Sequence, residues 1–376
     1  MAEKILLKDL LFNKGKLALI AGQIKAVYPD FAAQKFCAEV NLQFQKLELK
    51  QRIVVIAIFL KKYLPADYKI ALGILLDSLP EPLDENLSDD DFGDFIYASY
   101  GEFIVQNGCD KENLEISLRA LKDLTKRFSV EYAIRDFLNN FSARSLEFLH
   151  NCSVDKNYHV RRLASEGTRP NLPWGKKIAI SYKTSAEILE NLYFDSSRFV
   201  TRSVANHLND IAKIDPDFVL TTLKRWQKSK KQQQKEMDFI IKHALRTLIK
   251  QGNKAALELL GFHHKAKIIL SDFAISKKVA FNENLEFSFA LQSLENANAV
   301  VDYVIYFCNE KNILRAGKVF KLKNFTLEKD KIFVLNKKHK MLKQLTTRTL
   351  YEGECKMEIK VSGEVLQSAN FLLMTD

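Results

Sequence analysis

Residues 160–175 bring together side chains that could bind an anion, a cation and an aromatic ring. The stretch reads VRRLASEGTRPNLPWG, with three arginines, one carboxylate, Glu166, and one tryptophan, Trp174. A buried arginine needs an anion, because an unpaired guanidinium is too costly to keep in a core. An aromatic ring beside a carboxylate can hold a cationic ligand, by cation–π attraction and by charge. The stretch therefore predicts a site for a cationic ligand on an anion-binding surface.

The neighbouring residues predict that this site lies at the end of a helix. Gly167 is typical of a helix terminus, and Pro170 and Pro173 prevent the helix from resuming. We therefore expect Glu166 and Trp174 near a helix end rather than in the middle of a helix face.

A weak internal repeat surrounds the stretch. Arg162, Arg202 and Lys242 are spaced 40 residues apart, and each stands two positions after an apolar residue. A period near 40 is typical of HEAT-like repeats of paired helices. Such pairs place one row of helices on the concave side, so the three cations would line one groove suited to a DNA backbone. A structural repeat that merely tolerates surface cations is the alternative.

The basic charge is concentrated in the same region. The chain of 376 residues has a net charge of +11, and residues 113–264 carry 26 basic and 16 acidic side chains, a balance of +10. Of the 14 arginines, 11 lie between Arg119 and Arg246. Arginine suits bidentate phosphate contact, so a nucleic-acid backbone is the first partner to consider. A solvated basic face would give the same counts.

Several classes of protein are disfavoured. The five cysteines are scattered without a CxxC or Cys/His cluster, so we expect neither disulfides nor a metal site. The longest apolar run, residues 53–60, is too short to cross a bilayer, and the N-terminus is no secretory signal. We expect a cytoplasmic protein without a cofactor, a metal or a membrane partner.

The periodicity predicts a mainly α chain of two domains. Apolar residues recur at helical spacing up to Gly261, except in the acidic segment 77–94, which we expect to be a loop. Beyond it, alternation such as Leu285–Phe287–Phe289–Leu291 indicates strands of an immunoglobulin-like β-sandwich. We predict a HEAT-like helical-repeat solenoid over residues 1–264 and the sandwich over residues 265–376.

Three carboxylates of the basic segment could act on a cationic base. Glu131, Glu166 and Asp210 each lie among cations. Methylation at a ring nitrogen makes a base cationic and weakens its glycosidic bond, so the leaving group needs no acid. An enzyme would only stabilise the oxocarbenium-like sugar and place a water, which a fixed carboxylate can do. Simple salt bridges are the competing interpretation of these carboxylates.

Residues 160–175 resemble the core motif of the AlkC branch of the HEAT-like-repeat DNA glycosylases, which is related to AlkD. Two further stretches resemble the next repeats, SRFVTRSVANHLNDIAK at residues 197–213 and HALRTLIKQGNKAALELLGF at residues 243–262. The resemblance is strong over residues 113–264, and some members also have an immunoglobulin-like module. One departure is Asn171, where a basic residue is expected.

This resemblance implies excision of 3-methyladenine and 3-methylcytosine from DNA, without deep base flipping. Glu131, Glu166, Trp174 and Asp210 match the family's active-site groups. We predict DNA contacts from the cations of the repeats, which are Arg161, Arg162, Arg169, Arg202, Lys242 and Arg246.

The leading hypothesis is a monofunctional, monomeric DNA glycosylase that acts on alkylated double-stranded DNA and initiates base excision repair. Glu166 would stabilise the oxocarbenium ion and place the water, Glu131 and Asp210 would shape the acidic pocket, and Trp174 would pack on the lesion. A noncatalytic HEAT-repeat module that binds damaged DNA and a protein-interaction scaffold are the alternatives. The motif does not rank the two methylated bases or assign a role to the β domain.

Overall fold

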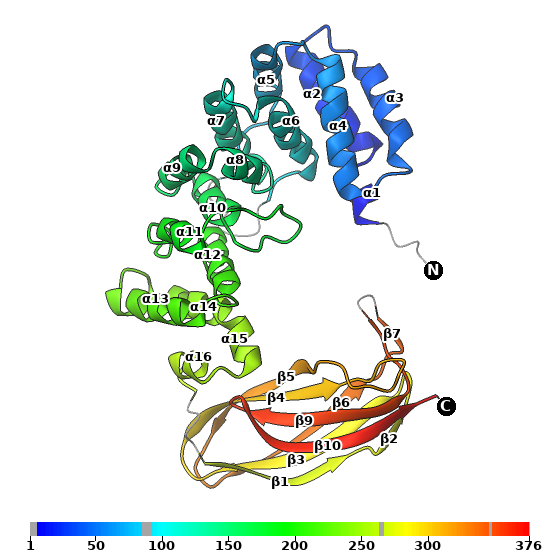
Figure 1. Cartoon of the computed structure of the whole chain (residues 1–376), viewed down its shortest axis with the longest axis vertical. Helices are drawn as coiled ribbons and strands as arrows, with labels where there is room; N and C mark the ends of the chain where they lie inside the picture. The colour runs from blue at the N-terminus through cyan, green and yellow to red at the C-terminus, as the bar shows by residue number, and fades with distance from the viewer. Residues whose placement is uncertain (1–5, 85–91, 263–266, 346–347, 376) are drawn as a thin grey trace. The chain divides into compact units, whose positions relative to one another are not determined.

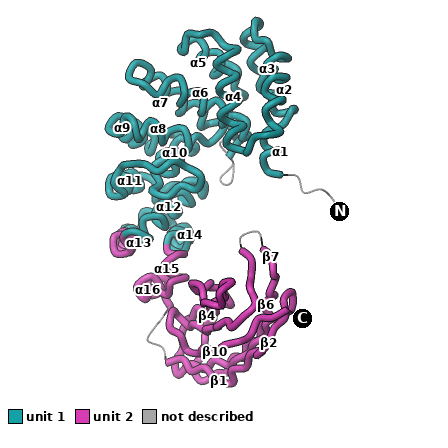
Figure 2. The backbone as a smooth tube through the Cα atoms, turned by 45° about the vertical axis from the view of Figure 1, so that its right-hand side comes forward, with its two compact units in different colours: residues 1–214, 225–244 teal, residues 215–224, 245–376 magenta. Residues whose placement is uncertain are grey.

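The computed structural model describes residues 6–84, 92–262, 267–345 and 348–375. The chain divides into two compact units (Figures 1 and 2). Unit 1 comprises residues 1–214 and 225–244, and unit 2 comprises residues 215–224 and 245–376. All residues of the predicted catalytic set belong to unit 1.

The N-terminal two thirds of the chain are helical, as the periodicity predicts. The helices are α1 (Leu7–Leu11), α2 (Lys14–Val27), α3 (Ala33–Phe44), α4 (Leu49–Tyr63), α5 (Tyr68–Asp77), the 3-10 helix η1 (Phe95–Tyr97), α6 (Ala98–Gly108), α7 (Leu114–Leu124), α8 (Ile134–Asn140), α9 (Ser142–Cys152), α10 (Tyr158–Gly167), α11 (Tyr182–Leu189), α12 (Arg198–Ile211), α13 (Pro216–Ser229), α14 (Gln234–Ala244), α15 (Arg246–Gln251) and α16 (Lys254–Leu259). In unit 1, α10, α12 and α14 follow one another in one row (Figure 1), and each packs on the next.

The 40-residue period corresponds to this row of helices. Arg162 lies in α10, Arg202 in α12 and Lys242 in α14. Their environments differ, because Arg162 is buried, Arg202 is half-buried and Lys242 is exposed. The repeat is therefore a repeat of helices, whereas the three cations have individual surroundings.

Local sequence explains where α10 begins and ends. The side chain of Asn157 caps its N-terminus by accepting hydrogen bonds from the backbone N–H groups of His159 and Val160. At the other end, Gly167 lies so close to α8 that a Cβ atom would be 2.6 Å from Ile134 Cγ2. No larger residue fits at this helix end without displacing α8.

One helix boundary differs from the helical periodicity of the sequence, which predicts a helix over residues 130–140. In the structure α8 begins only at Ile134, and residues 131–133 form a turn. Glu131 consequently lies in the turn before α8, where its carboxylate reaches Arg162 of α10.

Unit 2 contains two β-sheets. The strands are β1 (Ile268–Ile275), β2 (Lys278–Ala280), β3 (Asn284–Ser293), β4 (Ala297–Tyr306), β5 (Lys318–Leu327), β6 (Ile332–Lys340), β7 (Gln344–Leu345), β8 (Arg348–Thr349), β9 (Gly353–Val361) and β10 (Glu364–Met374). One sheet has the order β1-β3-β6 and the other the order β2-β10-β9-β4-β5, and β7 pairs with β8. The inward side chains of β3, β4 and β9 share one buried core, which makes the unit a β-sandwich.

A tight turn joins the last two strands. Ser362 and Gly363, between β9 and β10, have φ values of 46° and 87°. Two positive φ angles are the mark of a type I′ hairpin turn, which explains the glycine. Gly363 also touches Gly252 at the end of α15, where a Cβ atom would lie 2.7 Å from the Gly363 Cα atom. This contact places α15 on the sandwich.

The predicted boundary at residue 264 lies outside the described residues. The described chain changes from helix to strand between Leu259 and Ile268, but α15 and α16 belong to unit 2. A Lys254–Glu364 ion pair of 2.9 Å adds to their contact with the β9–β10 turn. The division into residues 1–264 and 265–376 stays a prediction. The predicted loop at residues 77–94 is described only in part, and it begins where α5 ends.

Candidate functional site

A cavity of about 180 Å³ lies where α10, α12 and the turn before α8 meet. We call it the acidic pocket, because two of the predicted carboxylates lie in its wall. Its lining residues are Phe92, Glu131, Tyr132, Arg162, Glu166, Arg169, Leu172, Pro173, Phe199, Arg202, Ser203 and Asn206.

Glu166 is held rigidly at the end of α10. Its Oε1 atom accepts a hydrogen bond of 2.6 Å from Arg169, and its Oε2 atom accepts one of 2.6 Å from the Ser203 hydroxyl. Burial acts to raise the pKa of Glu166, but the charges of Arg162 and Arg169 and the two hydrogen bonds outweigh it and lower the pKa. Glu166 is therefore a fixed negative charge that is 5% exposed.

Asp210 lies behind Arg169. Arg169 donates from Nε to the Asp210 carboxylate over 2.9 Å, and Lys213 lies 3.4 Å from the other oxygen of that carboxylate. Asp210 is 3% exposed and does not belong to the lining of the acidic pocket. Its geometry is that of a group that orients Arg169 against Glu166.

Glu131 differs from both of these carboxylates. Its Oε2 atom is buried and, among the described residues, has no hydrogen-bond partner. A guanidinium nitrogen of Arg162 lies 3.7 Å from this atom, within the range of an ion pair. A buried carboxylate oxygen is costly to leave without a donor. Glu131 also lines the acidic pocket, so its carboxylate can accept a hydrogen bond from a ligand or a water there.

Two aromatic rings enclose Arg162. Its guanidinium lies 4.3 Å from the ring centre of Phe199 and 5.2 Å from that of Phe92, and it donates to the Ser129 hydroxyl. Phe92 lies in the acidic segment 77–94, which the sequence marks only as a loop, so it has no signal of a site residue. Arg162 is thus oriented by packing as well as by Glu131 and Glu166.

Two residues of α12 support Glu166, Ser203 in the wall of the pocket and His207 outside its lining. The Nδ1 atom of His207 donates to the Ser165 carbonyl over 3.1 Å, and the Ser203 hydroxyl lies 2.9 Å from the Ser165 hydroxyl. Burial is the main reason why the pKa of His207 falls to about 3, so its ring is neutral near pH 7. Neither residue is marked by the motif, because both are brought to Glu166 by the packing of α12 on α10.

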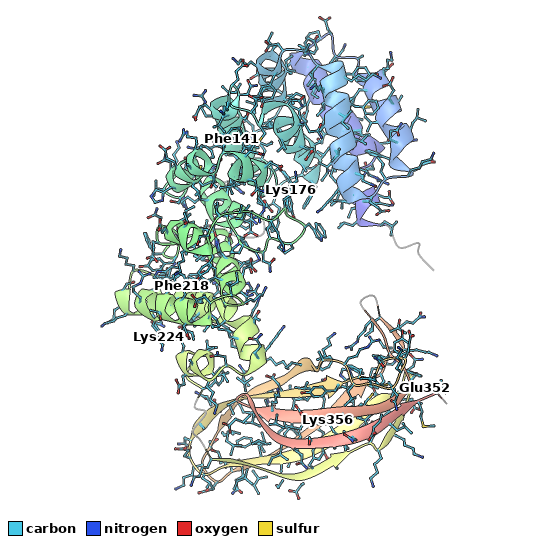
Figure 3. All side chains as sticks on the ribbon, viewed as in Figure 1. Phe141, Lys176, Phe218, Lys224, Glu352 and Lys356 are labelled. Atoms are coloured by element: carbon cyan, nitrogen blue, oxygen red, sulfur yellow. The ribbon has the colours of Figure 1, made fainter. Side chains whose placement is uncertain are left out.

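Arg135 is a second residue that sequence reasoning does not single out. It is buried in α8 and donates 2.9 Å hydrogen bonds to the carbonyls of Gly167 and Arg169, and a third bond to that of Lys176. Burial, and then the charge of Arg169, lower its pKa to about 10. It therefore connects the end of α10 to the segment that leads to α11, in which Figure 3 labels Lys176.

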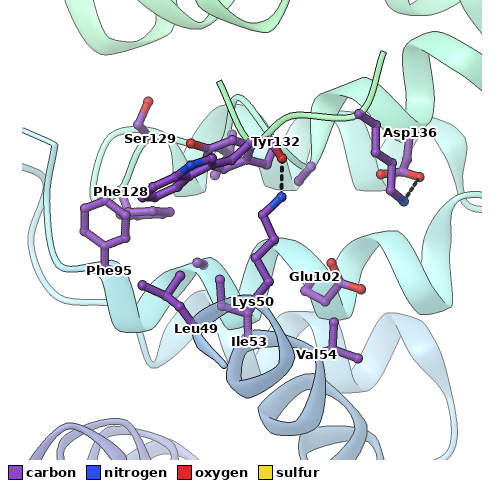
Figure 4. A pocket seen from close by; sticks show the side chains of 16 residues that line it. Leu49, Lys50, Ile53, Val54, Phe95, Glu102, Phe128, Ser129, Tyr132 and Asp136 are labelled. Atoms are coloured by element: carbon purple, nitrogen blue, oxygen red, sulfur yellow. Dashed lines mark hydrogen bonds and ion pairs between the residues drawn. The ribbon is translucent and has the colours of Figure 1, made fainter. Parts of the chain in front are cut away.

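Trp174 does not line the acidic pocket. It lines a neighbouring cavity of about 270 Å³, which we call the aromatic cavity (Figure 4). The lining residues are Leu49, Lys50, Ile53, Val54, Phe95, Ala98, Gly101, Glu102, Phe128, Ser129, Val130, Tyr132, Ala133, Asp136, Trp174 and Lys176. Tyr132 and no other described residue lines both cavities. The expected pairing of Glu166 and Trp174 in one pocket is thus replaced by two adjacent cavities.

The predicted DNA-contacting cations fall into three groups. Arg162 and Arg169 are buried among the carboxylates, and Arg161 pairs with Asp195 while donating to two backbone carbonyls. The half-buried Arg202 lines the acidic pocket, and Lys242 is exposed on α14. The sixth cation, Arg246, lies in unit 2. For all six, a contact with DNA stays a prediction.

The described part of the chain has neither a membrane-spanning helix nor a cluster of metal-ligating side chains. None of its helices is both long and apolar enough to pass through a membrane. The described residues also contain no group of three or more His, Cys, Asp or Glu side chains that could hold a metal ion.

The fold and the site define an α-helical repeat protein with a C-terminal β-sandwich and a buried cluster of carboxylates and arginines. Residues 270–375 match a family described as "Uncharacterised protein YhaZ, C-terminal Ig-like domain". Over 366 residues the chain is 34% identical to the uncharacterized protein YhaZ of Bacillus subtilis, covering 96% of this chain and 98% of that protein. The sandwich is therefore immunoglobulin-like, as the sequence predicts.

A solved structure matches nearly the whole chain. It is the Pseudomonas fluorescens alkylpurine DNA glycosylase AlkC, bound to DNA containing an abasic site analog. The TM-score is 0.87 and the identity 34%, and the match covers 99% of this chain and 100% of that protein. The chain belongs to the AlkC-type family, of which YhaZ is also a member. The family resemblance inferred from residues 160–175 is confirmed.

Proposed function

We propose that this protein is a DNA glycosylase that hydrolyses the N-glycosidic bond of cationic N3-methylated bases, 3-methyladenine and 3-methylcytosine, and so initiates base excision repair. The observation that carries the proposal is the acidic pocket, in which arginines keep Glu166 ionised while an oxygen of Glu131 is left to accept a hydrogen bond. The similarity to an alkylpurine DNA glycosylase over nearly the whole chain supports the same activity.

In this proposal the two carboxylates of the pocket have different roles in the reaction. When the bond between the sugar and a cationic base breaks, its electron pair leaves with the base, which becomes neutral. Glu166, clamped by Arg169 and Ser203, stabilises the positive charge that develops on the sugar. Glu131 accepts a hydrogen bond from the attacking water. The water oxygen bonds to the sugar carbon, and its proton passes to Glu131 and then to solvent.

The other predicted residues have supporting roles. Asp210 holds Arg169 in place and does not meet the substrate. Arg162 and Arg169 keep Glu166 ionised. Arg202 and Lys242 are the best placed of the predicted unit 1 cations to meet phosphates. Such contacts make DNA binding steeply dependent on salt. A monomeric state, a cytoplasmic location and hydrolysis without deep base flipping remain part of the proposal.

The decisive measurement is single-turnover release of 3-methyladenine from methylated duplex DNA. Glu166→Gln keeps the shape of the side chain but removes its charge. We expect a rate at least about a hundredfold lower, because a preorganised electrostatic group is lost, with little change in DNA affinity. Glu131→Gln is expected to lower the rate as well. The matched control is Glu147→Gln, which changes an exposed carboxylate on α9 that pairs with Arg144.

The same assay separates the alternatives. A noncatalytic module that binds damaged DNA would release no base from any variant, yet would bind the duplex. A protein-interaction scaffold would show neither base release nor salt-dependent DNA binding. Full activity of Glu166→Gln would overturn the role given to this carboxylate.

A further inference from the structure

We propose that the aromatic cavity is a second binding site, which takes a planar nitrogen heterocycle, namely the neutral methylated base after its release. The inference rests on the proposed function, since that reaction supplies the base. It is carried by the shape and chemistry of a cavity in unit 1 that the catalytic proposal leaves unused.

The walls of the cavity suit a flat aromatic ligand. Four rings line it, those of Phe95, Phe128, Tyr132 and Trp174, with aliphatic side chains from α4 between them (Figure 4). Bases stack on aromatic side chains with little dependence on their sequence identity, because every base has a π face. The cavity volume of about 270 Å³ leaves room for a single small heterocycle without a sugar.

The polar groups of the cavity match the edge of an aminopurine. Asp136 pairs with Lys176 at 2.6 Å, and the Lys50 ammonium group donates to the Trp174 carbonyl. Glu102 on α6 is different, because it accepts a hydrogen bond of 2.9 Å from a neutral amide, that of Gln106. A carboxylate can accept a hydrogen bond from the exocyclic amino group of adenine or cytosine. The Tyr132 phenol, whose pKa burial raises to about 12, stays protonated and can donate to a ring nitrogen.

Trp174 itself points to a ligand. Its backbone has φ = 64°, an unfavourable region for a residue other than glycine, and 59% of the residue is exposed. Both features are costly, and such residues persist where the surroundings fix them and function uses them. The bond from Lys50 to its carbonyl supplies that restraint across 124 positions of sequence. A stacked base would cover the exposed indole.

Cleavage of the glycosidic bond reverses which of the two cavities binds the methylated base more favourably. Before bond cleavage the methylated base is cationic and is attracted by Glu131 and Glu166. After cleavage it is neutral, so that attraction is lost and apolar, aromatic surroundings become more favourable. Tyr132 lines both cavities, which makes them neighbours. The aromatic cavity therefore accepts the base that the acidic pocket no longer holds.

The chain offers a direct spectroscopic test, since it has only two tryptophans. Trp226 is buried and stacks on Tyr193 at 4.4 Å, away from both cavities, so Trp226→Phe leaves Trp174 as the sole reporter. We expect saturable quenching of Trp174 fluorescence when 3-methyladenine is added without DNA. Quenching should persist after Glu166→Gln and disappear after Ala98→Leu, which fills the cavity with a good helix former.

A matched pair of probes tests the role of Glu102. Adenine carries the exocyclic amino group and hypoxanthine does not, so hypoxanthine should bind roughly tenfold more weakly, as for loss of a charged hydrogen bond. Equal affinities for adenine and hypoxanthine would show that Glu102 does not bind the base. If Trp226→Phe does not fold, equilibrium dialysis with 3-methyladenine can be used instead. The intact chain should then bind the base saturably and the Ala98→Leu variant should not.

The outcomes separate this inference from the proposed function. Base release from methylated DNA without saturable binding of free 3-methyladenine contradicts only the second site. Binding of the free base without any base release contradicts the glycosylase proposal and the role of the cavity as a site for the released base, but it confirms that the cavity binds the base. Binding that survives Ala98→Leu would mean that the base binds elsewhere, and would also overturn the second site.

Discussion

The acidic pocket and the aromatic cavity are neighbours in unit 1, yet they are built in opposite ways. The acidic pocket places Glu131 and Glu166 against Arg162 and Arg169, and both oxygens of Glu166 accept hydrogen bonds from other parts of the protein. The aromatic cavity has flat apolar walls, and its charged groups lie among them in pairs or on neutral partners.

This difference indicates that the acidic pocket acts through charge and the aromatic cavity through shape. Fixed charges stabilise a group whose charge changes during the reaction. They are most effective when they do not move as that charge develops. Apolar aromatic walls select for flatness and neutrality instead. A protein that binds a cation and produces a neutral heterocycle can use both. The following predictions test whether the two cavities are energetically separate.

The largest effect is expected from Arg169→Leu. This change leaves Glu166 and Asp210 buried without their shared cation, so we expect the free energy of unfolding to fall by about 3–5 kcal/mol. Base release should fall at least as much as in Glu166→Gln. Chemical denaturation and single-turnover kinetics measure the two losses. Free 3-methyladenine should still quench Trp174 in the folded fraction, and loss of that quenching would show that the cavities are coupled.

An intermediate effect is expected from Ser203→Ala. The hydroxyl of Ser203 donates to the Glu166 carboxylate, so its removal should slow base release roughly tenfold, the range for a hydrogen bond to a charged group. Ser145→Ala is a matched control, because within the described part of the chain the buried Ser145 hydroxyl has no hydrogen-bond partner. An equal effect of both changes in the kinetic assay would argue against a specific role for Ser203.

The smallest effect is a pH dependence of stability that arises behind the acidic pocket. The pKa of His207 is lowered from 6.5 to about 3, mainly by burial. Between these values the unfolded chain binds a proton that the folded chain excludes, so stability falls as the pH drops. The contribution is at most about 1.4 kcal/mol per pH unit.

The measurement compares urea unfolding of the intact chain and of His207→Asn at pH 7.5 and about 5.5. The variant cannot take up this proton, so its stability should change less between the two values. His150→Asn, which replaces an exposed histidine on α9, should behave like the intact chain. A parallel pH dependence in His207→Asn would exclude His207 as the source.

Much of the fold follows from local pattern. The apolar spacing of the first two thirds predicts helices because a 3.6-residue period depends only on near neighbours, and strict alternation predicts the strands in the same way. The start of α8 is missed, because residues 130–133 have helical periodicity but form a turn under the packing of α10. The packing of α15 on the sandwich has no local signal in the sequence, since it depends on the close approach of Gly252 and Gly363.

The site is predicted in composition but not in arrangement. Glu131, Glu166 and Asp210 lie around the same arginines, as the motif indicates, but Trp174 lies in a different cavity. Ser203, His207 and Arg135 carry no distinguishing signal, because buried serine, histidine and arginine look like surface residues in a sequence. Their importance arises from partners between 32 and 42 positions away.

By itself, the sequence determined the two kinds of architecture, the 40-residue repeat, the concentration of arginine and the residue types found in and around the acidic pocket. These are properties of composition and short-range spacing. Only the tertiary structure decided which carboxylate has an unbonded oxygen, which arginines are buried as clamps, and that Trp174 and Glu166 occupy separate cavities. Those outcomes depend on how stacked helices bring distant side chains within hydrogen-bonding distance, which no local pattern encodes.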